Sequence, residues 1–259
     1  MQVVEFRRPI GQRKGRQVDP AALQRVRALL EGEALRRDLL IEHLHRIQDA
    51  EGCLPAPLLA ALAELMRLSQ AEVFEVATFY HHFDVVKEGE TPPAALTVRV
   101  CDGLACEMAG ARDLLARLPA LLGPAVRVIP APCVGRCETA PVTVVHQYPV
   151  PHATLQAVQA AVAAGRTTGV VQGHIGFDAY RASGGYALLD DCHQGRRSAD
   201  SLIEALEHAG LRGLGGAGFP AGRKWRIVRS EPAPRLMAVN IDEGEPGTFK
   251  DRVYLERDP

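Results

Sequence analysis

Four cysteines offer the clearest chemistry in this sequence. Cys101 and Cys106 have four residues between them, Cys133 and Cys137 have three, and 26 residues separate the two pairs. Thiolates are soft, strongly donating ligands that select zinc or iron–sulfur clusters over hard cations. Paired zinc ligands usually have two residues between them, with four at the upper end of the range. The wider loops found here give four sulfurs room to bind two different irons. We therefore expect an iron–sulfur centre, with a zinc site or free or disulfide-bonded thiols as the alternatives.

Two arginines and two further cysteines need a separate interpretation. Arg99 and Arg136 are close to ligand cysteines in the sequence, and we expect them either to tune the cluster electrostatically or to point to solvent. Cys53 follows a predicted helix end and is expected to be a small buried side chain. Cys192 has no spaced partner and is expected to be a free thiol in a loop.

The composition is that of an ordinary globular protein. Of 259 residues, 47% are hydrophobic and 24% charged, and the formal net charge is −1. That charge gives no case for nucleic acid as a partner, and the apolar stretches are too short for membrane insertion, which needs roughly 20 residues. Residues 1–18 are basic and are expected to form a disordered arm, with a transit signal as the alternative. Because no secretory signal is recognised, we expect a cytoplasmic location in which structural disulfides are rare.

Residues 19–90 are expected to form a helical bundle. Asp19 and Pro20 place a capping acid before a proline at the first helical position. Ser69 and Glu72 have the spacing of a capping box that opens a later helix. The apolar pattern predicts helices that begin at Pro20 and cover residues 36–49 and 58–68, with a fourth after Ser69.

Residues 91–164 predict a compact α/β unit in which the cysteine pairs follow strands. The expected elements are strands at residues 96–100, 126–129 and 142–145 and helices at residues 108–122 and 154–163. Residues 165–176 are rich in glycine and threonine and are expected to be a linker. The predicted fold class is therefore α/β (α+β), with a new segment starting at residue 177.

A glycine cluster at residues 213–218 matches the dinucleotide-binding string G-x-G-x-x-G. That string is informative only after a strand and before a helix, and a predicted helix over residues 199–208 precedes it here, so a Rossmann unit is disfavoured. Glycines still allow backbone N–H groups to approach a phosphate, and the cations Arg212 and Lys224 lie on either side of the cluster in the sequence. A flexible loop is the alternative.

Acidic side chains follow an apolar run at residues 236–239 that is predicted to be a strand. Asn240, Asp242, Glu243 and Glu245 fall within six residues. Acids at the exit of a strand can accept hydrogen bonds from the hydroxyls of a ribityl or ribose chain. A solvated turn is the alternative.

Several longer motifs give residues 35–160 a family likeness. They are residues 48–52 (Gln-Asp-Ala-Glu-Gly), 75–80 (Glu-Val-Ala-Thr-Phe-Tyr), 100–106 and 133–141 (Cys-Val-Gly-Arg-Cys-Glu-Thr-Ala-Pro). In these segments the chain resembles the 24-kDa-type subunit of respiratory complex I. The resemblance implies a helical bundle followed by a thioredoxin-like ferredoxin domain, whose [2Fe–2S] cluster is ligated by Cys101, Cys106, Cys133 and Cys137.

Residues 176–259 resemble the start of the 51-kDa-type flavoprotein subunit of the same complex. The matching segments are residues 182–186, 210–222, 224–225 and 243–252. By this resemblance, the residues that face FMN are Gly213, Gly215, Gly216, Gly218, Lys224, Asn240 and Asp242. Those that face the nicotinamide nucleotide are Phe219, Glu243 and Glu245. Residues 177–259 are expected to be a partial FMN/NAD-binding domain with an incomplete site, because the family's later nucleotide contacts and its four-cysteine [4Fe–4S] motif do not follow.

The presence of both modules on one chain is similar to the diaphorase subunits of NAD-linked oxidoreductases. The resemblance implies electron transfer between NAD(H), FMN and iron–sulfur clusters, without an assigned catalytic side chain. Three features favour the β subunit of soluble NAD-dependent formate dehydrogenase by this resemblance: Leu214, where the complex I pattern commonly has arginine, the sequence of residues 242–245, and the full set of four cysteines, which hydrogenase fusions often lose. NAD-linked hydrogenase and NADH:quinone oxidoreductase are the alternative partner complexes. The rival class is a [2Fe–2S] electron carrier or assembly module without a working NAD site.

Overall fold

The computed structural model describes residues 16–169, 173–214 and 216–257. Most of the predicted arm, residues 1–15, and part of the predicted linker, residues 170–172, lie outside this description. The chain divides into an N-terminal unit, Met1–Val170 with Glu243–Lys250, and a C-terminal unit, Val171–Asp242 with Asp251–Pro259. The predicted mixture of helices and a sheet is confirmed, whereas the return of residues 243–250 to the N-terminal unit was not expected from the sequence.

Four helices form the first part of the N-terminal unit. They are α1 (Pro20–Leu29), α2 (Leu40–Glu51), which follows the short 3-10 helix η1 (Arg37–Leu39), α3 (Ala56–Met66) and α4 (Gln70–Phe79). Asp19 accepts a hydrogen bond from the N–H of Ala21, and the Ser69 hydroxyl accepts one from the N–H of Glu72, so both predicted caps are confirmed.

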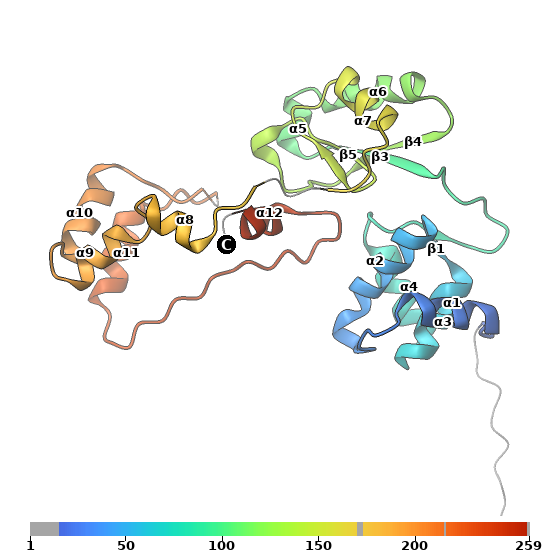
Figure 1. Ribbon diagram of the computed structural model, residues 1–259, viewed down its shortest axis with the longest axis horizontal. Coiled ribbons are helices and arrows are strands. Elements are labelled where there is room, and N and C mark those ends of the chain that lie inside the picture. The colour runs from blue at the N-terminus through green and yellow to red at the C-terminus, as the bar shows by residue number, and fades with distance from the viewer. Residues whose placement is uncertain (1–15, 170–172, 215, 258–259) are drawn as a thin grey trace, which may run out of the picture. The chain divides into compact units, whose positions relative to one another are not determined.

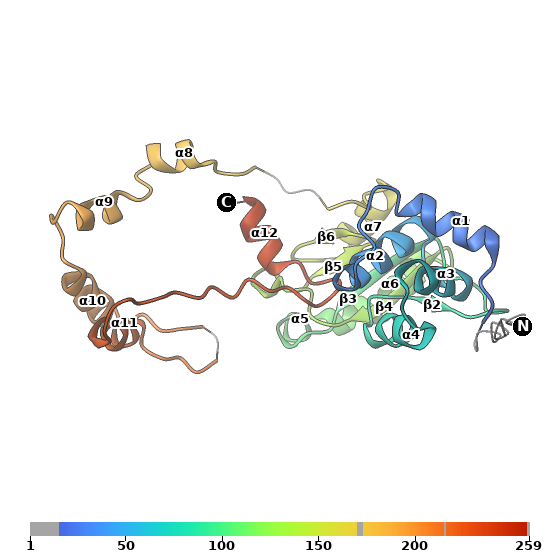
Figure 2. The same ribbon diagram turned by 90° about the horizontal axis from the view of Figure 1, so that it is seen from below.

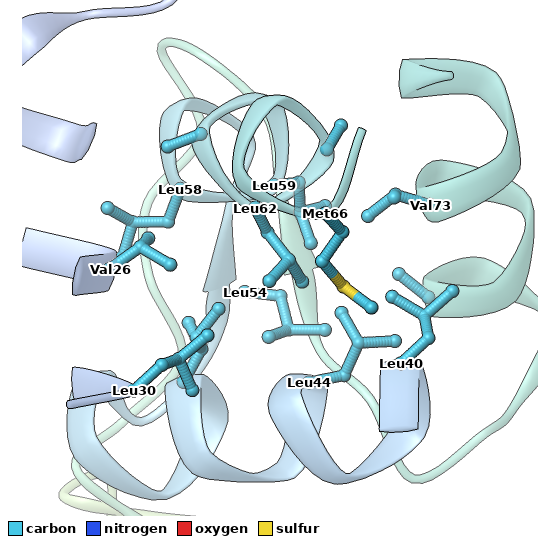
Figure 3. Close-up of a cluster of buried hydrophobic side chains, with 14 of the residues drawn as sticks. Val26, Leu30, Leu40, Leu44, Leu54, Leu58, Leu59, Leu62, Met66 and Val73 are labelled. Atoms are coloured by element: carbon cyan, nitrogen blue, oxygen red, sulfur yellow. The ribbon is translucent and has the colours of Figure 1, made fainter. Parts of the chain in front are cut away.

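The helices pack around a single apolar core. Figure 3 shows Val26 of α1, Leu44 of α2 and Leu62 of α3 converging on Leu54, and each of these side chains is fully buried. Leu54 belongs to β1 (Leu54–Pro55), which pairs in parallel with β2 (Val85–Val86). Cys53 is 3% exposed, as expected for a small buried side chain. Burial of these side chains contributes roughly 1.5–3 kcal/mol each.

A four-stranded sheet forms the second part of the N-terminal unit, in the order β4-β3-β5-β6. The strands are β3 (Leu96–Cys101), β4 (Val126–Ala131), β5 (Thr143–Val145) and β6 (Tyr148–Val150). β3 is parallel to β4 and antiparallel to β5. Figure 1 shows α6 (Ala111–Leu122) and α7 (Leu155–Ala163) together on one side of this sheet.

Two elements near the cysteines differ from the prediction. The helix predicted over residues 108–122 is instead α5 (Leu104–Met108) followed by α6, with Gly110 between them at φ +99°. Glycine adopts this left-handed conformation at little cost, so the chain changes direction there. β6 was not predicted, because it is three residues long and contains Pro149.

The C-terminal unit consists of short helices. They are α8 (Phe177–Ala182), α9 (Ala187–His193), α10 (Ala199–His208), α11 (Ala221–Ser230) and α12 (Lys250–Arg257), which begins on the last residue assigned to the N-terminal unit. α10 and α11 lie side by side (Figure 2), and Ile203 of α10 is buried. Cys192 lies in α9, which corrects the prediction of a loop. None of the helices in the described ranges is long and apolar enough to cross a membrane.

Candidate iron–sulfur site

The two cysteine pairs meet at one edge of the sheet. β3 and β4 run in parallel and in register, with Cys101 opposite Ala131, so both strands end at the same edge. The N–H of Asp102 donates to the carbonyl of Ala131 over 2.9 Å, which holds the two outgoing loops together. Cys133 follows Ala131 by two residues. The parallel pairing therefore brings together two pairs that are 26 residues apart in the sequence.

Cys101 and Cys106, here called the inner pair, are buried. Each is 1% exposed and belongs to the apolar core beneath the sheet. Cys106 lies in α5 rather than in the loop that the sequence predicted. Burial raises the pKa of Cys106 to about 12, and its hydrogen bond with Cys101 also acts to raise it, because each effect favours the neutral thiol.

Cys133 and Cys137, here called the outer pair, are exposed. Their sulfurs lie 3.5 Å apart, and the N–H of Gly135 points at the Cys133 sulfur over 3.4 Å. The hydrogen bond with Cys133 raises the pKa of Cys137, and partial burial adds to the effect. A backbone N–H directed at a sulfur stabilises the thiolate form that a metal requires.

Gly103 lies between the two pairs. A Cβ placed on Gly103 would be 3.1 Å from the Cβ of Cys133 and 3.5 Å from the sulfur of Cys101. The two loops are therefore in close contact at this point, and a larger residue would push them apart. The proximity of Cys101 also contributes to the raised pKa of Cys137, which links the two pairs electrostatically. Sequence reasoning missed Gly103, although a glycine between two candidate ligands is a signal that could have drawn attention to it.

The donor set fits a two-iron cluster. Four thiols lie in two close pairs, and a [2Fe–2S] cluster takes two thiolates on each iron. In the part of the chain that the structure describes, no three His, Cys, Asp or Glu side chains, these four cysteines included, are grouped to hold a metal ion. Coordination deprotonates a thiol outright, so binding of a cluster would release the protons of these thiols and become tighter as the pH rises.

The two arginines near the ligands are engaged by other groups. The Arg99 side chain is 11% exposed, pairs with the carboxylate of Asp84 at 3.4 Å and donates to the carbonyl of His82 at 3.2 Å. Arg136 pairs with Glu138 and lies over the ring of Phe249. A role for either arginine in tuning a cluster stays a prediction.

The predicted phosphate-binding glycines form a loop between two helices of the C-terminal unit. α10 precedes this loop and α11, which carries Lys224, follows it, so the element before the loop is a helix and not the strand of a Rossmann unit. The N–H of Gly213 donates to the carbonyl of Phe219 over 3.0 Å, which closes the loop. Gly216 and Gly218 have positive φ angles, as a nest of N–H groups requires, and Gly215 lies outside the described residues.

The acidic residues are divided between the two units. Asn240 and Asp242 belong to the C-terminal unit, where the N–H of Asp242 donates to the Asn240 side chain over 3.0 Å. Glu243 and Glu245 belong to the N-terminal unit. The strand predicted at residues 236–239 is wrong, because these residues pair with no strand among those described, and Leu236 is 91% exposed. Roles in binding FMN or NAD stay predictions for all of these residues.

Comparison with known proteins identifies the family of the segment that carries the four cysteines. Residues 26–166, more than half of the chain, match the family model of the thioredoxin-like [2Fe-2S] ferredoxin. The chain belongs to the thioredoxin-like [2Fe–2S] ferredoxin family. Residues 206–259 of this ferredoxin-family chain match a second model, the Nuo51 FMN-binding domain.

Relatives of this ferredoxin-family chain are subunits of larger complexes. The mitochondrial 51 kDa subunit of NADH-ubiquinone oxidoreductase of Aspergillus niger is 51% identical over 65 residues, which is 23% of this chain and 13% of that protein. The HoxS subunit alpha of the NAD-reducing hydrogenase of Cupriavidus necator is 27% identical over 91% of this chain and 44% of that protein. A crystal structure of NAD+-reducing [NiFe]-hydrogenase in the H2-reduced state is 30% identical, with a TM-score of 0.44, over 85% of this chain and 40% of that one. The chain thus spans less than half of the length of these relatives.

Proposed function

We propose that this chain is an electron-transfer subunit of an NAD-linked oxidoreductase complex. The observation that carries the proposal is the convergence of the inner and outer cysteine pairs at one sheet edge, where a Cβ added to Gly103 would meet both Cys101 and Cys133. The match of residues 206–259 to an FMN-binding domain supports a flavin as the neighbouring redox group. A [2Fe–2S] cluster, when bound, supplies one-electron transfer beside a flavin that exchanges hydride with NAD.

The chain's own residues supply the ligands and their surroundings. The inner pair is enclosed by apolar side chains of the sheet core, whereas the outer pair lies on a loop open to solvent. Burial excludes water from one side of the site, and solvent exposure and hydrogen bonds to sulfur are two factors that set the potential of a cluster.

For the partner complex, we propose the formate dehydrogenase type. The support is Leu214, the Asp-Glu-Gly-Glu sequence of residues 242–245 and the complete set of four cysteines. A hydrogenase complex is the second candidate, because the HoxS relative aligns over 91% of this chain. The test is to purify the assembled complex and to assay NAD reduction with formate and with hydrogen. Activity with formate is expected, whereas activity with hydrogen alone would refute the formate dehydrogenase proposal.

The cluster is tested by visible and low-temperature EPR spectra of the purified chain, recorded anaerobically before and after dithionite. We expect a brown protein whose EPR signal appears on reduction. Cys137→Ser is expected to abolish or alter this signal, whereas Cys192→Ser, which changes a thiol in the C-terminal unit, leaves it unchanged. A colourless protein that holds zinc would overturn the electron-transfer proposal and indicate a scaffold protein with a structural zinc site.

The NAD site is tested separately by flavin content and by NADH oxidation with an artificial acceptor. Bound FMN and turnover in the assembled complex are the expected results. A chain that holds the cluster but supports neither would instead be a [2Fe–2S] carrier or assembly module.

A further inference from the structure

A short segment from the FMN-domain match packs against the loop that carries the outer cysteine pair. This segment, residues 247–250 (Gly-Thr-Phe-Lys), is here called the clasp. Its first two residues complete a turn in which the N–H of Thr248 donates to the carbonyl of Glu245 over 3.1 Å. Thr248 and Cys133 are 115 positions apart in the sequence, so this contact is made only in the folded chain.

The clasp makes two hydrogen bonds to consecutive backbone carbonyls of the outer loop. The Thr248 hydroxyl donates to the carbonyl of Cys133 over 3.0 Å, and the N–H of Phe249 donates to the carbonyl of Val134 over 3.2 Å. The Phe249 side chain packs against the apolar core of the sheet, and the guanidinium of Arg136 lies 6.0 Å from its ring centre. The clasp is therefore attached both to the loop and to the core below it.

Gly135 shows how close this approach is. A Cβ at Gly135 would lie 2.7 Å from the Cβ of Lys250 and 2.9 Å from the Cγ2 of Thr248, so a larger residue cannot occupy the position without moving the clasp. At the other end of the clasp, a Cβ on Gly247 would lie 2.7 Å from the Nδ1 of His82. Glycines at both contact points allow the clasp to fit between His82 and the outer loop.

We propose that the clasp fixes the outer ligand loop, with Thr248 and Phe249 as positioning residues for Cys133 and Cys137. An exposed loop with two ligands needs external contacts to hold its geometry, and loss of a group that orients a metal ligand typically costs about 10–100-fold in metal affinity. The inference rests on the proposed function only in taking this loop as cluster-binding. It adds that residues just after Glu243 and Glu245 are mechanically connected to the cluster site.

The first test removes one hydroxyl. Thr248→Val deletes the donor to Cys133 at constant shape, and Thr248→Ser restores it. Thr78→Val is the matched control, because the Thr78 hydroxyl also donates to a backbone carbonyl, at 2.8 Å, but within α4. Loss of one hydrogen bond is expected to speed amide hydrogen exchange of residues 134–137 about fivefold in the reduced, cluster-free full chain. In the cluster-loaded chain, release of iron to a chelator should accelerate by a similar factor, and the EPR line shape should change.

The second test uses the close approach at Gly135. Gly135→Ala is expected to speed exchange of residues 248–250, far away in the sequence, as well as of its own loop. Gly89→Ala is the matched control for backbone strain: its φ is +79° against +80° for Gly135, but nothing lies within 4 Å of its added Cβ.

The outcomes separate this inference from the proposed function. Faster exchange of the outer loop in Thr248→Val supports the clasp even if the chain binds no cluster, in which case only the electron-transfer proposal fails. Exchange that matches the Thr78→Val control, with no response of residues 248–250 to Gly135→Ala, overturns the clasp even if a cluster is bound.

Discussion

Asp84 is expected to be a centre of stability, because it neutralises two arginines that extend from the sheet. Its carboxylate accepts hydrogen bonds from Arg99 of β3 and Arg127 of β4. The three side chains are 17%, 11% and 26% exposed, respectively. Asp84→Asn keeps the shape but removes the charge, so Arg99 stays buried and loses its main counter-ion, with only the weaker attraction of Asp49 remaining.

The expected cost follows from this burial. Breaking a fully buried ion pair from one side costs about 3–5 kcal/mol. Because Asp84 and Arg127 retain some contact with water, we expect Asp84→Asn to lower the free energy of unfolding by about 2–3 kcal/mol. The pKa of Arg99 agrees in direction, since burial lowers it and the Asp84 charge opposes that effect. A change of this size is a large fraction of the stability of a domain.

The assay is urea unfolding of the reduced chain followed by far-UV circular dichroism. Fluorescence of Trp225 would report on the C-terminal unit instead. Asp113→Asn is the control, because Asp113 pairs with Arg117 while both side chains are more than 60% exposed, and it should cost no more than about 0.5 kcal/mol. In a chain that already carries Arg99→Met, Asp84→Asn should lower the free energy of unfolding by only about half as much, because the buried charge that Asp84 neutralises is no longer there. Equal costs for Asp84→Asn and Asp113→Asn, or full additivity with Arg99→Met, would refute the reasoning.

Two further predictions concern pH and thiol reactivity. The pKa of His82 is lowered to about 3, first by burial and then by Arg99 and neighbouring histidines. Its pKa in the unfolded chain is near 6.5. As the pH falls, the unfolded chain therefore takes up this proton before the folded chain does. Titration of His82 should therefore leave stability unaffected above pH ~6.5 and lower it by at most about 1.4 kcal/mol per pH unit between there and pH ~3. Unfolding curves at several pH values would measure the total slope, which His82→Phe should reduce by this contribution. In the cluster-free chain, iodoacetamide should label the exposed outer pair at least about tenfold faster than the inner pair. Mass spectrometry of timed samples would measure both rates. Equal rates would mean that the inner pair is not buried in solution.

Local interactions explain what could be predicted from the sequence. Asp19 and Ser69 cap helices through contacts with residues two or three positions away, so their role is visible in a short window. The strands before Cys101 and Cys133 were recognised because alternating apolar residues indicate a pleated, half-buried segment. Errors occurred where a local pattern depends on distant partners: residues 236–239 are apolar enough for a strand, but a strand also needs a neighbour to complete its hydrogen bonds.

The sequence by itself determined the chemistry of this protein, because four cysteines at two short spacings have few uses other than binding a soft metal centre. Tertiary structure decided the environment of those cysteines. Parallel pairing of β3 and β4 set the two pairs against Gly103, and packing of the sheet core buried the inner pair but not the outer one. The contacts of Asp84 and of the clasp likewise join residues that are 15, 43 and 115 positions apart. Such contacts produce no periodic pattern or fixed spacing in the sequence, since only the folded backbone brings their atoms together.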